Sequence, residues 1–216
     1  MSRTLAVVPV RGTTRTKTRL APLFSAGARA CLVRHMLLHV LDTIERSGGV
    51  DHTLIITRDP GALPDHVAAS PSCTVVAQSG EGLNAAILLG RDRAVAGGYD
   101  RMLAILPDLP MLTPGDVRAL LAEPAAAVLA PDRHGTGTNA LLLRLCDATE
   151  RLQFAFGSRS AVRHIAEIER LGLRWATVDT RGLQHDLDTP EDWAKLPEDV
   201  RATLLTCILS LADSPA

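Results

Sequence analysis

The chain has 216 residues, of which 46% are hydrophobic, and a formal net charge of −1. This length supports one sizeable α/β domain with a full core, and the hydrophobic content excludes general disorder. The near-zero charge provides no global field to attract nucleic acid, and 3% aromatic residues are too few for base-stacking platforms.

The four cysteines are widely separated and form no C-x-x-C pair; they are Cys31, Cys73, Cys146 and Cys207. This spacing favours neither a zinc site nor a redox dithiol. We therefore expect thiols in the core or on helix faces, in a reducing compartment. The sequence shows no signal-peptide pattern and no apolar run of about 18 residues, which predicts a cytoplasmic protein.

Strand-like and helix-like segments alternate along the chain. Apolar runs predict strands at residues 5–10, 53–57, 74–77, 102–106, 126–130, 139–143 and 173–178. Helices are expected from Ser25 to Gly48, from about Leu83, from Thr113, from about Ser160, and in two short C-terminal segments. Short continuous apolar strands are typical of a sheet covered on both faces. The sequence thus predicts a single α/β domain over residues 1–216 with a mostly parallel, doubly wound sheet.

The loop after the first strand is strongly basic. Its cations are Arg11, Arg15, Lys17 and Arg19, and no acidic residue precedes Asp42. Such loops meet at the ligand-binding edge of an α/β sheet, and Gly12 with the neighbouring threonines would let this one bend around a polyphosphate. A solvated basic turn is the alternative. The loop has neither the Rossmann glycine pattern nor the P-loop pattern, which argues against both classes.

A glycine-rich loop at residues 78–86 follows the third strand and enters a helix. Gly80 and Gly82 would permit close backbone approach to a flat ligand, and Asn84 could pair with a base edge. An ordinary strand-to-helix turn is the alternative.

Carboxylates follow the fourth and the last predicted strands. Asp108 stands between two prolines that stiffen its turn, and Asp186 and Asp188 alternate, so they share one face of an extended segment. Carboxylates at this edge of the sheet are suited to Mg²⁺. An Asx-turn at Asp108 and a helix cap at Asp188 or Thr189 are the alternatives.

Two further polar segments offer an anion site. Residues 133–139 provide a cation, an imidazole, hydroxyls and backbone N–H groups, and residues 156–164 include a predicted helix N-terminus with Arg159 and Arg163. A flexible hairpin, and a surface histidine at His164, are the alternatives. The candidate residues for binding an anionic small molecule are Arg133, His134, Thr136, Thr138, Asn139, Gly157 and Ser160.

Taken in order, these motifs resemble those of the 2-phospho-L-lactate guanylyltransferases, which belong to the molybdopterin-guanylyltransferase-like nucleotidyltransferases. The resemblance covers about residues 8–192, and its pieces are VPV (8–10), KTRLA (17–21), GLNAA (82–86), DLP (108–110), APDRHGTGTN (130–139), FGS (156–158) with Ser160 and His164, and DLDTPED (186–192). The chain departs at Arg11, where the family commonly has Lys, and at Leu106-Pro107, where the family commonly has Pro-Ala.

The resemblance implies a Rossmann-like nucleotidyltransferase fold and transfer of GMP from GTP to the phosphate of a three-carbon acid, with release of pyrophosphate. The acceptor would be 2-phospho-L-lactate, phosphoenolpyruvate or 3-phospho-D-glycerate, in coenzyme F-420 biosynthesis. The seven candidate residues for an anionic small molecule would then be the acceptor-binding residues. The implied catalytic residues are Lys17, Asp108 and Asp188, and the implied Mg²⁺ ligands are Asp108, Asp186 and Asp188. The implied nucleotide contacts are Val10, Arg11, Gly12, Lys17, Arg19, Gly80, Gly82 and Asn84.

Two other functions remain open: a related nucleotidyltransferase with a molybdopterin or sugar-phosphate acceptor, and a catalytically silent nucleotide-binding module. The expected partners are GTP and a small phosphorylated carboxylic acid, without nucleic acid or membrane. A homodimer, or the downstream transferase of the same pathway, is the candidate protein partner. An apolar helix face could form the dimer contact; it consists of Val200, Leu204, Leu205, Ile208 and Leu209.

Overall fold

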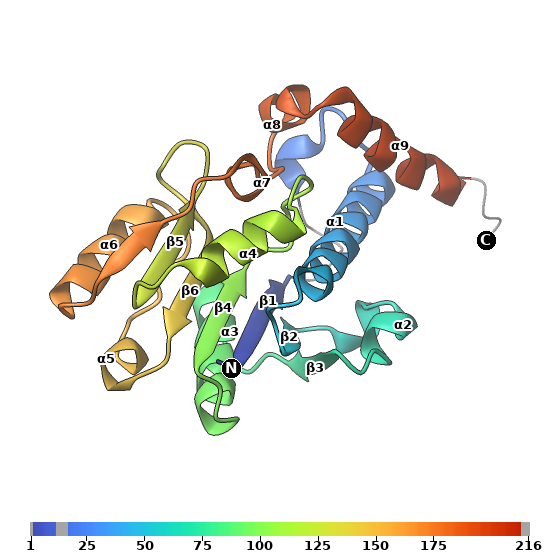
Figure 1. The fold of residues 1–216 in the computed structure, drawn as a ribbon. Helices are drawn as coiled ribbons and strands as arrows, with labels where there is room; N and C mark the ends of the chain where they lie inside the picture. Colours follow the sequence, from blue (N-terminus) through green and yellow to red (C-terminus); the bar gives the residue numbers. More distant parts are fainter. Residues whose placement is uncertain (1, 12–16, 213–216) are drawn as a thin grey trace.

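The computed structural model describes residues 2–11 and 17–212 (Figure 1). Its sheet has seven strands in the order β3-β2-β1-β4-β6-β5-β7. The strands are β1 (Thr4–Val10), β2 (His52–Thr57), β3 (Cys73–Ala77), β4 (Arg101–Ile105), β5 (Ala127–Pro131), β6 (Thr138–Arg144) and β7 (Trp175–Thr177). Strand β6 is antiparallel to β4 and β5, and the other pairs are parallel. The predicted fold class is confirmed.

Helices cover both faces of the sheet (Figure 1). Helices α1 (Ala26–Ser47) and α4 (Pro114–Ala122) pack on one face, where Val8 is buried against them. Helices α3 (Gly82–Ala96) and α6 (Ser160–Arg170) pack on the other, where Val7 is buried. Because successive side chains of a strand point to opposite faces, both faces need apolar residues, which accounts for the unbroken apolar runs.

The shorter elements are η2 (Thr18–Leu20), η3 (Pro60–Ala62), α2 (Asp65–Ala68), α5 (Asp147–Glu150), α7 (Arg181–Gln184) and α8 (Pro190–Lys195), and the chain's last helix is α9 (Glu198–Ala212). No helix in residues 2–11 and 17–212 is long and apolar enough to cross a membrane.

Local signals in the sequence place both ends of α1 and the start of α4 correctly. The Ser25 hydroxyl accepts a hydrogen bond from the Ala28 backbone N–H at the start of α1, and the helix ends at Gly48, whose φ is 68°. Helix α4 begins with a capping box between Thr113 and Asp116. These are the caps that satisfy the free backbone groups of a helix.

The C-terminal part departs from the sequence-based prediction. Helix α9 has 15 residues, so the expectation of two short helices is wrong for it. Leu204 is buried against α1, with Val200 and Ile208 packed beside it, whereas Leu205 and Leu209 are 41% and 64% exposed. Most of the helix face that we predicted as a dimer contact therefore packs within the chain.

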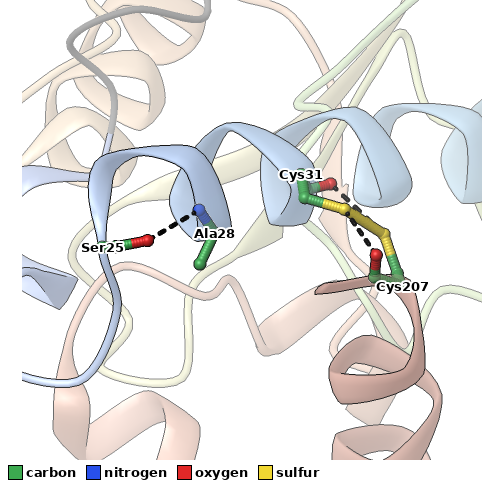
Figure 2. Close-up of a disulfide and its surroundings, with 4 residues drawn as sticks. All are labelled: Ser25, Ala28, Cys31 and Cys207. Carbon is green, nitrogen blue, oxygen red and sulfur yellow. Dashed lines mark hydrogen bonds between the residues drawn. A yellow bond between two sulfur atoms is a disulfide. The ribbon is translucent and has the colours of Figure 1, made fainter. Parts of the chain in front are cut away.

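A disulfide joins Cys31 in α1 to Cys207 in α9 (Figure 2). The prediction that all cysteines are thiols is wrong for this pair. The two residues are 176 positions apart, and only the packing of α9 along α1 brings them together. Cys73 and Cys146 are free cysteines.

Candidate active site

A cleft of ≈ 810 Å³ opens at the carboxyl edge of the sheet. Val10 ends β1, Asp108 follows β4 and Asp132 follows β5, while Thr138 begins the antiparallel β6 at the same edge. Helix α1 and the start of α6 add further walls. The lining includes Val10, Arg11, Lys17, Arg19, Val33, Met36, Leu37, Leu83, Asp108, Asp132, Thr136, Thr138, Asn139, Phe156, Gly157, Arg159, Ser160, Asp186 and Asp188. The sequence motifs thus converge on one site.

The centre of the cleft is a lysine held by two carboxylates. The Lys17 ammonium donates to Asp108 Oδ2 at 2.6 Å and also to Asp188 Oδ1, and its side chain is only 9% exposed. Burial alone lowers the pKa of this ammonium, but the charges of Asp108 and Asp188 and their hydrogen bonds outweigh burial and raise it well above its ordinary value. Lys17 is therefore a fixed positive charge in this structure.

The Asp188 carboxylate is not used as a helix cap. Helix α8 begins with a capping box in which Thr189 accepts from the Asp192 N–H and Asp192 Oδ2 accepts from the Thr189 N–H. The backbone N–H of Asp188 also donates to Asp192. Of the two caps that the sequence left open, the structure uses Thr189, so the side chain of Asp188 is available to the cleft.

Asp186 completes an acidic group beside Lys17. Asn139 Nδ2 donates to its Oδ1 at 3.3 Å and to the Leu183 carbonyl at 2.8 Å. Burial, followed by the charges of Asp108 and Asp188, raises the pKa of the Asp186 carboxyl to about 6. The backbone ties the two acidic loops together, because the Leu187 N–H donates to the Asp108 carbonyl.

The donor set suits a hard divalent cation, although the described residues contain no arrangement of three His, Cys, Asp or Glu side chains that would already hold one. Asp108 Oδ1 is buried and has no hydrogen-bond partner in the described part of the chain. A buried carboxylate oxygen normally has a partner. The unpartnered carboxylate oxygen of Asp108 therefore fits the Mg²⁺ assignment, which remains a prediction.

The loop between β5 and β6 is folded around Asp132. Its Oδ1 accepts from the backbone N–H groups of His134 and Thr136, at 3.1 and 2.8 Å. The Thr136 carbonyl in turn accepts from Ala161 N–H in the first turn of α6. This bond fixes the loop against the helix N-terminus, and both lie at the cleft. Asp132 was not among the predicted site residues, although it belongs to the motif that contains them.

Five of the seven predicted acceptor-binding residues line the cleft, namely Thr136, Thr138, Asn139, Gly157 and Ser160. Arg133 and His134 do not. Arg133 is turned to α8, where it pairs with Asp192 at 2.7 Å and Glu191 at 3.5 Å. His134 is exposed. The structure gives Arg133 the role of tying the loop to α8, because the buried carboxylate of Asp192 requires a partner.

Some of the predicted nucleotide contacts line the cleft and others do not. Val10, Arg11, Lys17 and Arg19 line the cleft, and Gly12 lies outside the described residues. Gly80, Gly82 and Asn84 are not part of the lining. Asn84 clamps the Phe156 backbone instead, donating to its carbonyl at 3.1 Å and accepting from its N–H at 2.7 Å. Gly80 and Gly82 have φ values of 86° and 83°, the left-handed turn that leads into α3.

Sequence reasoning missed the apolar wall formed by Val33, Met36 and Leu37, because helical periodicity marks these residues only as core. Sequence reasoning also left Arg159 out of the candidate site residues. Lys17 and Arg159 are the two non-glycine residues with positive φ in the described part of the chain, at 54° and 53°, and both line the cleft. Such backbone strain gathers at functional sites.

The fold is that of nucleotidyltransferases. A nucleotide-diphospho-sugar transferase structure from Desulfovibrio desulfuricans G20 superposes with a TM-score of 0.75 at 21% identity, covering 97% of this chain and 98% of that one. A nucleotidyl transferase structure from Methanothermobacter gives 0.64 at 17% identity, covering 94% and 98%.

The family is defined more closely by sequence. Residues 4–197 match the family described as "Guanylyl transferase CofC like", and the chain belongs to it. The phosphoenolpyruvate guanylyltransferase of Sphaerobacter thermophilus is 40% identical over 89% of this chain and 92% of that protein. The 2-phospho-L-lactate guanylyltransferase of Methanothermobacter thermautotrophicus is 34% identical, covering 90% and 84%, and the 3-phospho-D-glycerate guanylyltransferase of Phenylobacterium zucineum is 35% identical, covering 87% and 86%.

Proposed function

We propose that this protein transfers GMP from GTP to the phosphate of a three-carbon phospho-acid and releases pyrophosphate, as a step of coenzyme F-420 biosynthesis. The observation that carries the proposal is the Lys17–Asp108–Asp188 ion group in a cleft that is also lined by hydroxyl and backbone N–H donors. The names of the relatives support the nucleotide and the acceptor class.

The chemistry needs no general base. The acceptor phosphate has a second pKa of about 6 and is ionised at neutral pH. One of its oxygens attacks the α-phosphorus of GTP, the new P–O bond forms, and the bond between the α-phosphorus and the bridging oxygen breaks. The electron pair leaves with pyrophosphate. Catalysis then reduces to alignment and to neutralisation of charge.

We assign these tasks to two groups of residues in the cleft. In one group, Arg11, Lys17 and Arg19 would neutralise the triphosphate and the leaving pyrophosphate. In the other, the N-terminus of α6 with Gly157 and Ser160, together with the Thr138 hydroxyl, would bind the acceptor's carboxylate and phosphate.

Asp108, Asp186 and Asp188 would hold Mg²⁺, whose charge stabilises the negative oxygens around the α-phosphorus when it is bound. Lys17 lies against two of these carboxylates, so it would exchange them for phosphate oxygens when the nucleotide enters.

Pyrophosphate release across a panel of nucleotides and acceptors tests the proposal. GTP with Mg²⁺ should release pyrophosphate only when phosphoenolpyruvate, 2-phospho-L-lactate or 3-phospho-D-glycerate is added. Phosphoenolpyruvate is the first acceptor to try, given the 40% identical relative. Release with a sugar phosphate or a molybdopterin instead would assign another acceptor, and binding of GTP without release under any condition would indicate a silent module.

A further inference from the structure

His164 is a completely buried histidine directly behind the acceptor end of the cleft. It is 0% exposed and is not among the lining residues, so it cannot touch a bound acceptor. Its Nδ1 lies 3.0 Å from the hydroxyl oxygen of Thr138, which does line the cleft. Its Nε2 lies 2.9 Å from the Ala155 backbone nitrogen, and its ring packs edge-on against Phe156 at 4.7 Å.

These two contacts determine where the imidazole proton lies. A backbone N–H can only donate, so the Nε2 that faces Ala155 must be the acceptor and carries no proton. A neutral imidazole has one protonated nitrogen, which is then Nδ1, and Nδ1–H donates to the Thr138 oxygen. Burial, and next the charge of Arg163, lower the pKa of His164 to about 4, in agreement with a neutral ring at neutral pH.

This tautomer directs the proton of the Thr138 hydroxyl. The hydroxyl oxygen already accepts from His164, so its own O–H is released to donate elsewhere. We propose that His164 is a positioning residue of the acceptor subsite, which aims the Thr138 O–H into the cleft toward the anionic acceptor. The inference rests on the proposed function, which places the acceptor at this end.

The two nitrogens of His164 have separate tasks. The Nδ1 contact acts on a side chain at the cleft, whereas the Nε2 contact holds the backbone just before Phe156 and Gly157. Asn84 fixes Phe156 from the other side, so the backbone retains a second support when the Ala155 bond is lost. Loss of the Nδ1 donor should therefore weaken acceptor binding, and loss of the Nε2 acceptor should mainly weaken the fold.

Two amide substitutions separate these tasks. In His164→Asn the amide nitrogen can take the place of Nδ1 and still donate to Thr138, but Ala155 loses its acceptor. In His164→Gln the amide oxygen can take the place of Nε2 and still accept from Ala155, but the donor to Thr138 is lost. Thr138→Val removes the hydroxyl while preserving shape, and Thr138→Ser retains it as the matched control.

The KM for the best acceptor of the panel and the KM for GTP are measured by pyrophosphate release, with Tm as the control for folding. We expect His164→Gln to raise the acceptor KM about tenfold, the usual effect of one hydrogen bond, and to leave the KM for GTP unchanged. His164→Asn should keep the acceptor KM within about threefold and lower Tm. The double variant His164→Gln with Thr138→Val should be no worse than Thr138→Val alone, because both act through one hydroxyl.

Equal acceptor KM values for the Asn and Gln variants, or additive effects in the double variant, would overturn the inference while wild-type turnover upholds the proposed function. A wild type that releases no pyrophosphate with any acceptor would overturn both. Imidazole ¹⁵N NMR of the wild type at neutral pH provides a check that needs no variant: it should show Nδ1–H, and an Nε2–H or imidazolium signal for His164 would contradict the inference.

Discussion

At the scale of single residues, Lys17 combines three unusual properties. It is one of two lysines in the chain, its backbone is left-handed, and its ammonium is buried between two carboxylates. Removing one member of a partly buried ion group leaves the other charges without compensation. Lys17 should therefore matter for stability as well as for turnover.

Lys17→Met should reduce kcat/KM by at least about 100-fold, because it removes a fixed charge from the phosphate end. It should also lower apo stability by roughly 1–3 kcal/mol. Millimolar Mg²⁺ should then raise the Tm of the variant more than that of the wild type, since the cation would occupy carboxylates that Lys17 has vacated. Lys195→Met is the matched control, because Lys195 is 51% exposed in a surface pair. Equal Mg²⁺ shifts in all three proteins would contradict the metal assignment.

Asp188→Asn should abolish most turnover without unfolding the protein. The capping box of α8 belongs to Thr189 and Asp192, so the helix start survives the change. The loss should be greatest at limiting Mg²⁺, measured as the apparent Mg²⁺ constant in the pyrophosphate assay. Full activity of this variant at limiting Mg²⁺ would transfer the metal role to Asp186.

His164 predicts a pH dependence of stability. Its pKa is about 4 in the folded chain against an ordinary 6.5, so below about pH 6.5 the unfolded chain takes up a proton that the folded chain does not. Stability is therefore lost as the pH falls from about 6.5 to 4, by about 3 kcal/mol from this group. Urea unfolding of the wild type and His164→Gln should show their stability difference changing by that amount between pH 7 and pH 4. A difference independent of pH would contradict a neutral buried His164.

At the scale of elements, the disulfide joins the helix that supplies Val33, Met36 and Leu37 to the cleft with the last helix of the chain (Figure 2). A cross-link over 176 positions constrains the unfolded chain strongly. The disulfide should therefore support the position of α1, and with it one wall of the site.

When Cys31 and Cys207 are both changed to Ser, the free energy of unfolding measured in denaturant should be about 2–4 kcal/mol lower than that of the oxidised wild type. A reducing agent should lower the free energy of unfolding of the wild type to that of the double variant. Cys146→Ser, at an exposed free cysteine, is the control and should change little. Four reactive thiols in the denatured, unreduced wild type would show that the bridge does not form.

At the scale of the whole molecule, the sequence was sufficient to predict the strands, the caps of α1 and α4 and the edge of the sheet at which the cleft lies. Apolar runs, Ser25, Thr113 and the glycine at position 48 are local signals. They depend only on residues close in sequence, so they can be read without knowing which elements pack together. The strand β7 was predicted at 173–178 and is shorter, Trp175–Thr177, because it pairs with β5 alone at the sheet edge. The direction of β6 was not predicted, since an apolar run does not specify the direction of its strand.

The candidate site was predicted less completely, because its details depend on contacts across the chain. Lys17 and Asp188 are 171 positions apart, and no spacing rule connects them. Arg133 and Asn84 were assigned to ligands on residue type, but the fold uses their polar groups for Asp192 and for the Phe156 backbone. A polar side chain near a site can equally support its walls, and only its partners distinguish the two roles.

The central claim is that the acceptor's phosphate, rather than its carboxylate, attacks the α-phosphorus of GTP in this cleft. Phosphorus-31 NMR of the product formed from GTP, Mg²⁺ and the best acceptor tests this claim most directly. Attack by the phosphate joins two phosphorus atoms through one oxygen, so the product should show two doublets with a shared coupling constant, together with released pyrophosphate. Two uncoupled singlets would indicate attack by the carboxylate, and the absence of any guanylylated product would contradict the account.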